Sequence, residues 1–146
     1  MTQVSVIGSG AEHEQRAEEV GRLLAERGAT VVCGGLGEVM AAAARGAKRA
    51  GGTTIGILPG TSFEDANEWI DHAVATGIGH ARNLSVVASG DAVIAVGGRW
   101  GTLAEIGFAR ALGRYVVILE PGWEIEDVPR AATPAEAVEL ALSAAR

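Results

Sequence analysis

The sequence predicts an α/β protein of the Rossmann-like class, with one doubly wound parallel sheet and helices on both of its faces. Short apolar runs alternate along the chain with amphipathic helical segments, as they do in successive βα units. Glycine-rich turns follow several of these runs, and 21 of the 146 residues are glycine. At this length we expect one domain that spans residues 1–146.

Five apolar runs are expected to form the buried strands of the sheet. Each is nearly continuous in apolar residues, which is typical of parallel strands that are covered on both faces. A further strand is considered at residues 70–74, although Asp71 and His72 interrupt its apolar pattern. The five runs span residues 4–7, 30–33, 53–58, 92–96 and 115–119.

Helical periodicity appears between the strands. Residues 12–27 and 38–50 repeat apolar side chains at i, i+3, i+4 and i+7, which predicts two amphipathic helices. Two more helices are predicted at residues 82–89 and 102–113, the second ending at Gly113. Thr133 is expected to begin the last helix, because the sequence Thr-Pro-Ala-Glu supplies an N-cap, a proline at the first helical position and a glutamate at the third.

Two longer stretches have no regular pattern. They span residues 59–67 and 120–132, lengths that are typical of binding loops or oligomer contacts, and the composition does not choose between these.

Composition limits the classes of partner. The net charge of −6 argues against broad nucleic-acid binding, which needs a basic surface to neutralise phosphates. Cys33 is the only cysteine, so there is no intrachain disulfide, as is usual in a reducing cytoplasm. No apolar segment is long enough to span a bilayer, and the first residues do not resemble a signal peptide. We therefore expect a cytoplasmic protein with no membrane partner.

Three glycine-rich turns follow predicted strands and therefore fall on the same edge of the sheet. Glycine lets the backbone approach an oxyanion, and the following helix N-terminus adds free N–H groups and partial positive charge. We interpret these turns as a phosphate-binding edge; the alternative is that each is only a tight strand-to-helix turn. The candidate ligand-binding residues in them are Gly8, Ser9, Gly10, Gly34, Gly35, Gly97, Gly98, Arg99, Trp100, Gly101 and Thr102.

Three familiar sites are absent from the sequence. The first turn has His13 where a dinucleotide-binding fingerprint needs glycine, which disfavours NAD. A Walker A loop needs Gly-Lys-Ser/Thr, but the only lysine, Lys48, lies in a predicted helix. The histidines are widely spaced along the chain, so no metal site is predicted.

The third turn allows two interpretations of Thr102 and Glu105. They form either a capping box at a helix start or, with Arg82, an acid/base group and an anchor for a ribose or phosphate. Arg99 is either a second phosphate ligand or an exposed loop residue. Trp100 either stacks on a base or lies in an oligomer interface.

The segment from Gly79 to Glu105 resembles the Lonely guy family, once described as possible lysine decarboxylases. That family has the motifs Met-His-x-Arg-Lys and Pro-Gly-Gly-x-Gly-Thr-x-x-Glu. Here His80-Ala81-Arg82-Asn83 matches the first in its His and Arg, and residues 97–105 match most of the second. The chain departs from the motifs at Asn83, Gly97 and Arg99, and its overall pattern is closer to the branch that contains molybdenum cofactor carrier proteins.

The resemblance implies two hypotheses for function. A carrier-like protein would bind a phosphorylated nucleotide-like or pterin-like molecule, with Asn83 and Arg82 joining the glycine turns at the site. A Lonely guy enzyme would instead cleave the N-glycosidic bond of a nucleoside 5′-monophosphate, with Arg82 and Glu105 as catalytic residues. Both hypotheses imply a homodimer or higher homo-oligomer, and neither requires a cofactor. The bound ligand would be phosphate, a nucleoside monophosphate or a molybdopterin-type molecule. The sequence does not decide between a protein that only binds this ligand and one that cleaves it.

Overall fold

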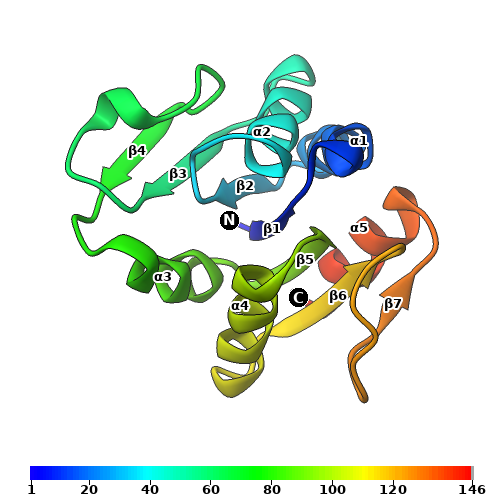
Figure 1. The fold of residues 1–146 in the computed structure, drawn as a ribbon. Coiled ribbons are helices and arrows are strands. Elements are labelled where there is room, and N and C mark those ends of the chain that lie inside the picture. Colours follow the sequence, from blue (N-terminus) through cyan, green and yellow to red (C-terminus); the bar gives the residue numbers. More distant parts are fainter. Residues whose placement is uncertain (146) are drawn as a thin grey trace.

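A computed structural model describes residues 1–145 and confirms the predicted α/β class. Seven strands, all parallel, form one sheet in the order β4-β3-β2-β1-β5-β6-β7 (Figure 1). The strands are β1 (Gln3–Ser9), β2 (Thr30–Cys33), β3 (Thr54–Leu58), β4 (His72–Ala75), β5 (Ala92–Gly97), β6 (Tyr115–Leu119) and β7 (Arg130–Ala131).

Helices cover both faces of the sheet, as a doubly wound topology requires. On one face lie α1 (Glu14–Glu26), α2 (Val39–Arg49) and α5 (Pro134–Ala144), and on the other α3 (Arg82–Ser89) and α4 (Trp100–Ala111) (Figure 1). Each face has its own apolar core. Short 3₁₀ turns at Ala11–His13 and Gly79–Ala81 lead into α1 and α3, and a third lies at Phe63–Asp65.

The centre of the sheet is the pair β1 and β5. Their register runs from Val4 opposite Ala92 to Ser9 opposite Gly97, so the two strands end side by side. The chain winds outward in opposite directions from this pair, through β2 to β4 on one side and β6 to β7 on the other. Such a reversal leaves a crevice at the carboxyl ends of the two strands, where ligands of open α/β sheets bind.

Some boundaries differ from the predicted ones. The uncertain strand at residues 70–74 forms β4, displaced to His72–Ala75, and β7 lies within the stretch predicted to be irregular. The helix predicted to begin at Thr102 begins at Trp100. The predicted N-cap of the last helix is confirmed, since Glu136 N donates to Thr133 Oγ1 at 3.2 Å. Within residues 1–145, every helix is too short or too polar to cross a membrane.

Candidate functional site

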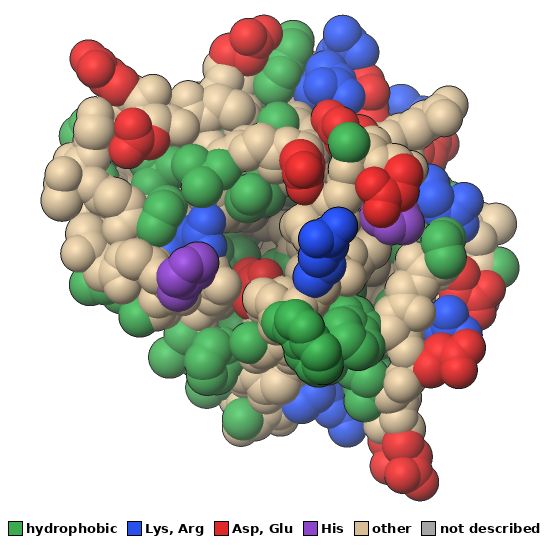
Figure 2. Space-filling view, viewed as in Figure 1, with side chains coloured by type: hydrophobic (Ala, Val, Ile, Leu, Met, Phe, Trp, Pro, Cys, Tyr) green, Lys and Arg blue, Asp and Glu red, His purple; other side chains and the backbone are tan. Residues whose placement is uncertain are grey.

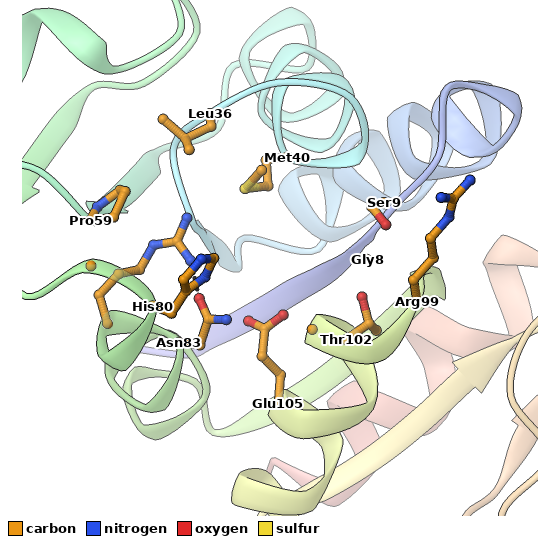
Figure 3. Close-up of a pocket in the computed structure, with 13 residues that line it drawn as sticks. Gly8, Ser9, Leu36, Met40, Pro59, His80, Asn83, Arg99, Thr102 and Glu105 are labelled. Atoms are coloured by element: carbon orange, nitrogen blue, oxygen red, sulfur yellow. Dashed lines mark hydrogen bonds between the residues drawn. The ribbon is translucent and has the colours of Figure 1, made fainter.

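A cavity of about 390 Å³ opens where β1 and β5 end, between the glycine turns and the starts of α3 and α4 (Figures 2 and 3). Its volume lies in the usual range for small-molecule sites. Figure 3 shows Asn83 and Glu105 with their polar ends toward the space between α3 and α4. The lining residues are Gly8, Ser9, Leu36, Met40, Pro59, Gly79, His80, Arg82, Asn83, Arg99, Gly101, Thr102 and Glu105.

A deeper recess of about 70 Å³ continues from the floor of this cavity. Arg82, Asn83 and Glu105 line both spaces, as does Gly8 at the end of β1. Two charged groups, Arg82 and Glu105, therefore lie together in the recess, whereas Arg99 lines only the main cavity. In the recess, lower exposure to water strengthens their interactions with a ligand.

Arg82 is the first residue of α3 and is buried, with 8% of its surface exposed. Its guanidinium donates to Asn83 Oδ1, and Nη2 donates to the carbonyl oxygen of Gly34 at 3.4 Å. A Cβ at Gly34 would lie 2.6 Å from Met40 Sδ and 2.7 Å from Arg82 Nη2, so a side chain there would displace both groups. The glycine after β2 thus makes room for a buried cation.

The buried guanidinium lacks a full set of partners. Arg82 Nε is buried without a hydrogen-bond partner, and none of the ion pairs found within residues 1–145 includes Arg82. Burial lowers the pKa of Arg82, and the nearby Glu105 carboxylate opposes that shift. An arginine remains charged under such conditions. The floor of the cavity therefore holds a positive charge that its neighbours neutralise incompletely.

Glu105 lies on α4 and faces the same recess. Removal from water raises the pKa of Glu105 from 4.5 to about 7, and the attraction of Arg82 offsets only part of that rise. Desolvation outweighs the attraction because the carboxylate loses its hydration without gaining a close partner. Glu105 can therefore exchange a proton near neutral pH, as a general acid or base must.

The N-terminus of α4 forms another wall of the cavity. Arg99 is its N-cap residue, and no side chain caps the helix there. The first N–H groups of an uncapped helix have no intrahelical acceptor and attract anions. Because α4 begins before Thr102, the capping-box interpretation of Thr102 and Glu105 is wrong. Thr102 is instead buried against Gly98, where a Cβ would lie 2.2 Å from Thr102 Oγ1.

Eight of the residues singled out from the sequence line the main cavity, and Gly34 joins them in the recess. They come from four segments that are far apart in the chain, as the strand-end argument requires. The eight are Gly8, Ser9, Arg82, Asn83, Arg99, Gly101, Thr102 and Glu105.

Other candidates lie outside the cavity lining. Gly10 donates its backbone N–H to Glu38, and Gly35 packs against Leu58. Gly97 and Gly98 border a separate hollow of about 450 Å³ beside His13 and Trp123. Trp100 is 76% exposed, and its ring centroid lies 5.5 Å from that of Trp123.

Five lining residues had not been predicted. They are Leu36, Met40, Pro59, Gly79 and His80. Leu36 and Pro59 follow β2 and β3 at the same sheet edge, so the strand-end rule could have found them. Met40 carried no such signal, because a methionine on an amphipathic helix is ordinarily a core residue.

Comparison with known proteins identifies the family of this chain. Residues 1–144, nearly the whole chain, match the SLOG cluster4 family. The chain belongs to the SLOG cluster4 family. An uncharacterised protein of Archaeoglobus fulgidus is 43% identical over 146 residues, which cover 98% of this chain and 96% of the relative.

Solved structures similar to this SLOG cluster4 chain include molybdenum cofactor proteins. The molybdenum cofactor binding protein of Rippkaea orientalis superimposes with a TM-score of 0.91 at 32% identity, over 97% of this chain and 96% of the other. The molybdenum cofactor carrier protein of Chlamydomonas reinhardtii gives 0.89 at 31% identity, over 98% and 97%. The likeness to the carrier branch expected from the sequence is confirmed.

A more distant relative belongs to the Lonely guy group. It is a probable cytokinin riboside 5′-monophosphate phosphoribohydrolase of Oryza sativa subsp. japonica, 33% identical over 103 residues. The match covers 68% of this SLOG cluster4 chain but 42% of the rice protein. The resemblance to the Lonely guy motifs is therefore a true but distant relationship.

Proposed function

We propose that this protein binds a phosphorylated pterin-like or nucleotide-like molecule in the cavity at the ends of β1 and β5. The phosphate accepts hydrogen bonds from the first N–H groups of α4 that line the cavity, those of Gly101 and Thr102. Arg82 supplies positive charge from the floor of the same cavity. The heterocycle lies toward the apolar wall that Leu36, Met40 and Pro59 provide.

The buried charge of Arg82 is the observation that carries this proposal. A buried guanidinium is ordinarily paired with a carboxylate or another anion, because an isolated charge is expensive to desolvate. Here its hydrogen-bond partners are the neutral Asn83 side chain and the Gly34 carbonyl group. An anionic ligand in the cavity supplies the missing counter-charge. Both molybdenum cofactor proteins described above share the fold at about one-third identity, which favours a pterin-like ligand.

Ligand-induced thermal stabilisation tests the proposal. A phosphorylated ligand present at about 100 times its Kd stabilises the native state by about 2.7 kcal/mol. For a domain of this size, the resulting rise in Tm is about 5–10 °C. Phosphorylated pterins and nucleoside monophosphates should raise Tm, whereas the same compounds without phosphate should not. Equal shifts with and without the phosphate group, or no shift in the whole panel, would contradict the proposal.

A second candidate function is supported by the state of Glu105. Its raised pKa and its place beside Arg82 fit a residue that assists attack of water on a ribose C1′, as in a phosphoribohydrolase. Incubation with AMP and N6-substituted AMP should then release free base at a rate that Glu105→Gln lowers by about 10²-fold or more. Absence of base release from a protein that binds AMP would leave the carrier function alone.

Assembly into a homo-oligomer is part of the proposal. Large apolar side chains on α3, on α4 and at the C-cap of α4 are substantially exposed, namely Leu84, Trp100, Phe108 and Leu112. Figure 2 shows an apolar group beside the cavity opening. Exposed aromatic and aliphatic side chains concentrated on two adjacent helices favour an interface between copies of the chain.

A further inference from the structure

Glu38 forms an unusual contact at the edge of the cavity. It immediately precedes α2, but its side chain does not cap that helix. Instead, Glu38 Oε2 accepts a hydrogen bond of 2.7 Å from the backbone N–H of Gly10, in the turn after β1. The contact joins the loops that follow two neighbouring strands, β1 and β2. A carboxylate of the chain itself therefore binds an amide of the first glycine-rich turn.

The backbone at Glu38 is strained by this arrangement. Its φ of 55° and ψ of −125° lie in a region that residues with a side chain rarely adopt. Such a conformation typically costs about 1–3 kcal/mol and persists where surrounding structure holds it in place. Val39 is fully buried on one side of Glu38, and the Gly10 hydrogen bond holds the carboxylate on the other. Glycine would adopt this backbone without strain.

The exposed contact lies just outside the cavity lining, next to residues that do line the cavity. Gly8 and Ser9, which precede Gly10, line the cavity, and so do Leu36 and Met40, which flank Glu38 in the chain (Figure 3). In doubly wound nucleotide-binding folds, the amides of the first turn receive the pyrophosphate group. In this chain the Gly10 amide is already bonded to an anionic oxygen. The amides at the start of α4, in contrast, have no side-chain cap.

We propose that Glu38 is a specificity-determining residue that occupies an oxyanion position at the first turn and restricts the cavity to ligands with one phosphate group. A second phosphate would have to displace the Glu38 carboxylate from Gly10 and would meet its negative charge. Diphosphates and pyrophosphate-linked dinucleotides are therefore rejected. This inference rests on the proposed binding of a phosphorylated ligand.

Two variants separate the charge of Glu38 from its hydrogen bond. Glu38→Gln keeps an acceptor for the Gly10 amide but removes the charge, whereas Glu38→Gly removes both and relieves the backbone. Calorimetric titration at low salt should show the wild-type protein binding AMP at least about tenfold more tightly than ADP. The ratio of the affinity for AMP to the affinity for ADP should fall to about two in Glu38→Gly and to an intermediate value in Glu38→Gln.

Glu12→Gln provides a matched control. Glu12 is an exposed carboxylate near Gly10, but it does not accept the Gly10 hydrogen bond. Glu12→Gln changes the net charge of the protein by the same amount as Glu38→Gln. It should leave the ratio of the affinities for AMP and ADP unchanged. An equal fall in Glu12→Gln and Glu38→Gln would show a general charge effect and overturn the inference.

The Gly10 amide provides a direct readout by NMR. Addition of inorganic pyrophosphate or ADP should shift its resonance in Glu38→Gly, but not in the wild-type protein. If AMP binds and the ratio does not respond to Glu38→Gly, or responds without a Gly10 shift, the inference about Glu38 fails and the proposed function stands. If phosphate, AMP, ADP and the phosphorylated pterins of the thermal-shift panel all leave the proteins unchanged, the proposed function fails, and this inference fails with it.

Discussion

Replacement of Glu105 by glutamine is expected to stabilise the protein above neutral pH. The folded-state pKa of Glu105 is about 7, against 4.5 in a solvated chain. Between these values the folded protein binds more protons than the unfolded chain, so wild-type stability falls as pH rises through this window. A pKa difference of one corresponds to about 1.4 kcal/mol, so at pH 8 Glu105→Gln should be more stable by about 2–3 kcal/mol.

Urea unfolding of both proteins at pH 4.5, 6, 7 and 8 measures this difference. The two curves of free energy against pH should nearly coincide at the lowest pH and diverge as the pH rises. Glu19→Gln is a suitable control, because pairing with Arg22 lowers the pKa of Glu19, the opposite direction. Parallel curves for the wild-type protein and Glu105→Gln would show that Glu105 is not desolvated in the native state.

Such a result would bear on function as well as stability. A carboxyl group that destabilises the native state at working pH is retained where the site uses it. In a hydrolase, Glu105 would exchange protons with water and substrate. In a carrier, its neutral form would donate a hydrogen bond to the ligand, and its charged form would complement Arg82. The pH dependence of ligand affinity distinguishes the protonated from the ionised form of Glu105. Protonation near pH 7 removes the negative charge of the carboxyl group and gives it a hydrogen-bond donor.

Local patterns were sufficient to predict most of the fold. The apolar runs that became β1, β2, β5 and β6 are buried on both faces, and such strands have an unambiguous sequence pattern. Thr133 and Glu136 cap α5 because capping depends on residues three apart. The edge strand β7 has only two residues, too few for any periodicity.

Tertiary contacts explain what the sequence could not predict at the site. The bond between Glu38 and Gly10 joins residues 28 positions apart, and no local pattern indicates it. The pKa of Glu105 depends on burial by neighbouring segments, which a capping interpretation of Thr102 and Glu105 ignored. The guanidinium of Arg82 occupies space that a side chain at Gly34 would compete for, 48 positions away in the chain. The strand-end rule predicted where the cavity lies, and packing determines the charge and burial of its lining residues.

Arg82→Met is expected to separate ligand binding from stability. Methionine is apolar and of comparable length, and removal of the buried Arg82 charge also removes its cost of desolvation, so at pH 4.5, where Glu105 is protonated in the folded protein, stability should change little. Ligand affinity should fall by about 10²-fold or more, because the phosphate loses a charge-assisted hydrogen bond worth about 2–4 kcal/mol in a desolvated site. Calorimetric titration with the best phosphorylated ligand and urea unfolding without ligand measure the two effects.

Arg114→Met is the matched control for this change. Arg114 also donates to a backbone carbonyl, that of Ala88 at 2.9 Å, but it lies just before β6, at the opposite edge of the sheet from the cavity. Its loss should leave ligand affinity unchanged. Because Arg82 lowers the folded-state pKa of Glu105, Arg82→Met should also extend the pH-dependent loss of stability to higher pH and make it larger, while its onset stays near the unfolded pKa of 4.5. Unchanged affinity in Arg82→Met would remove the anion-binding role of the guanidinium, and an unchanged pH profile would show that Arg82 and Glu105 do not interact.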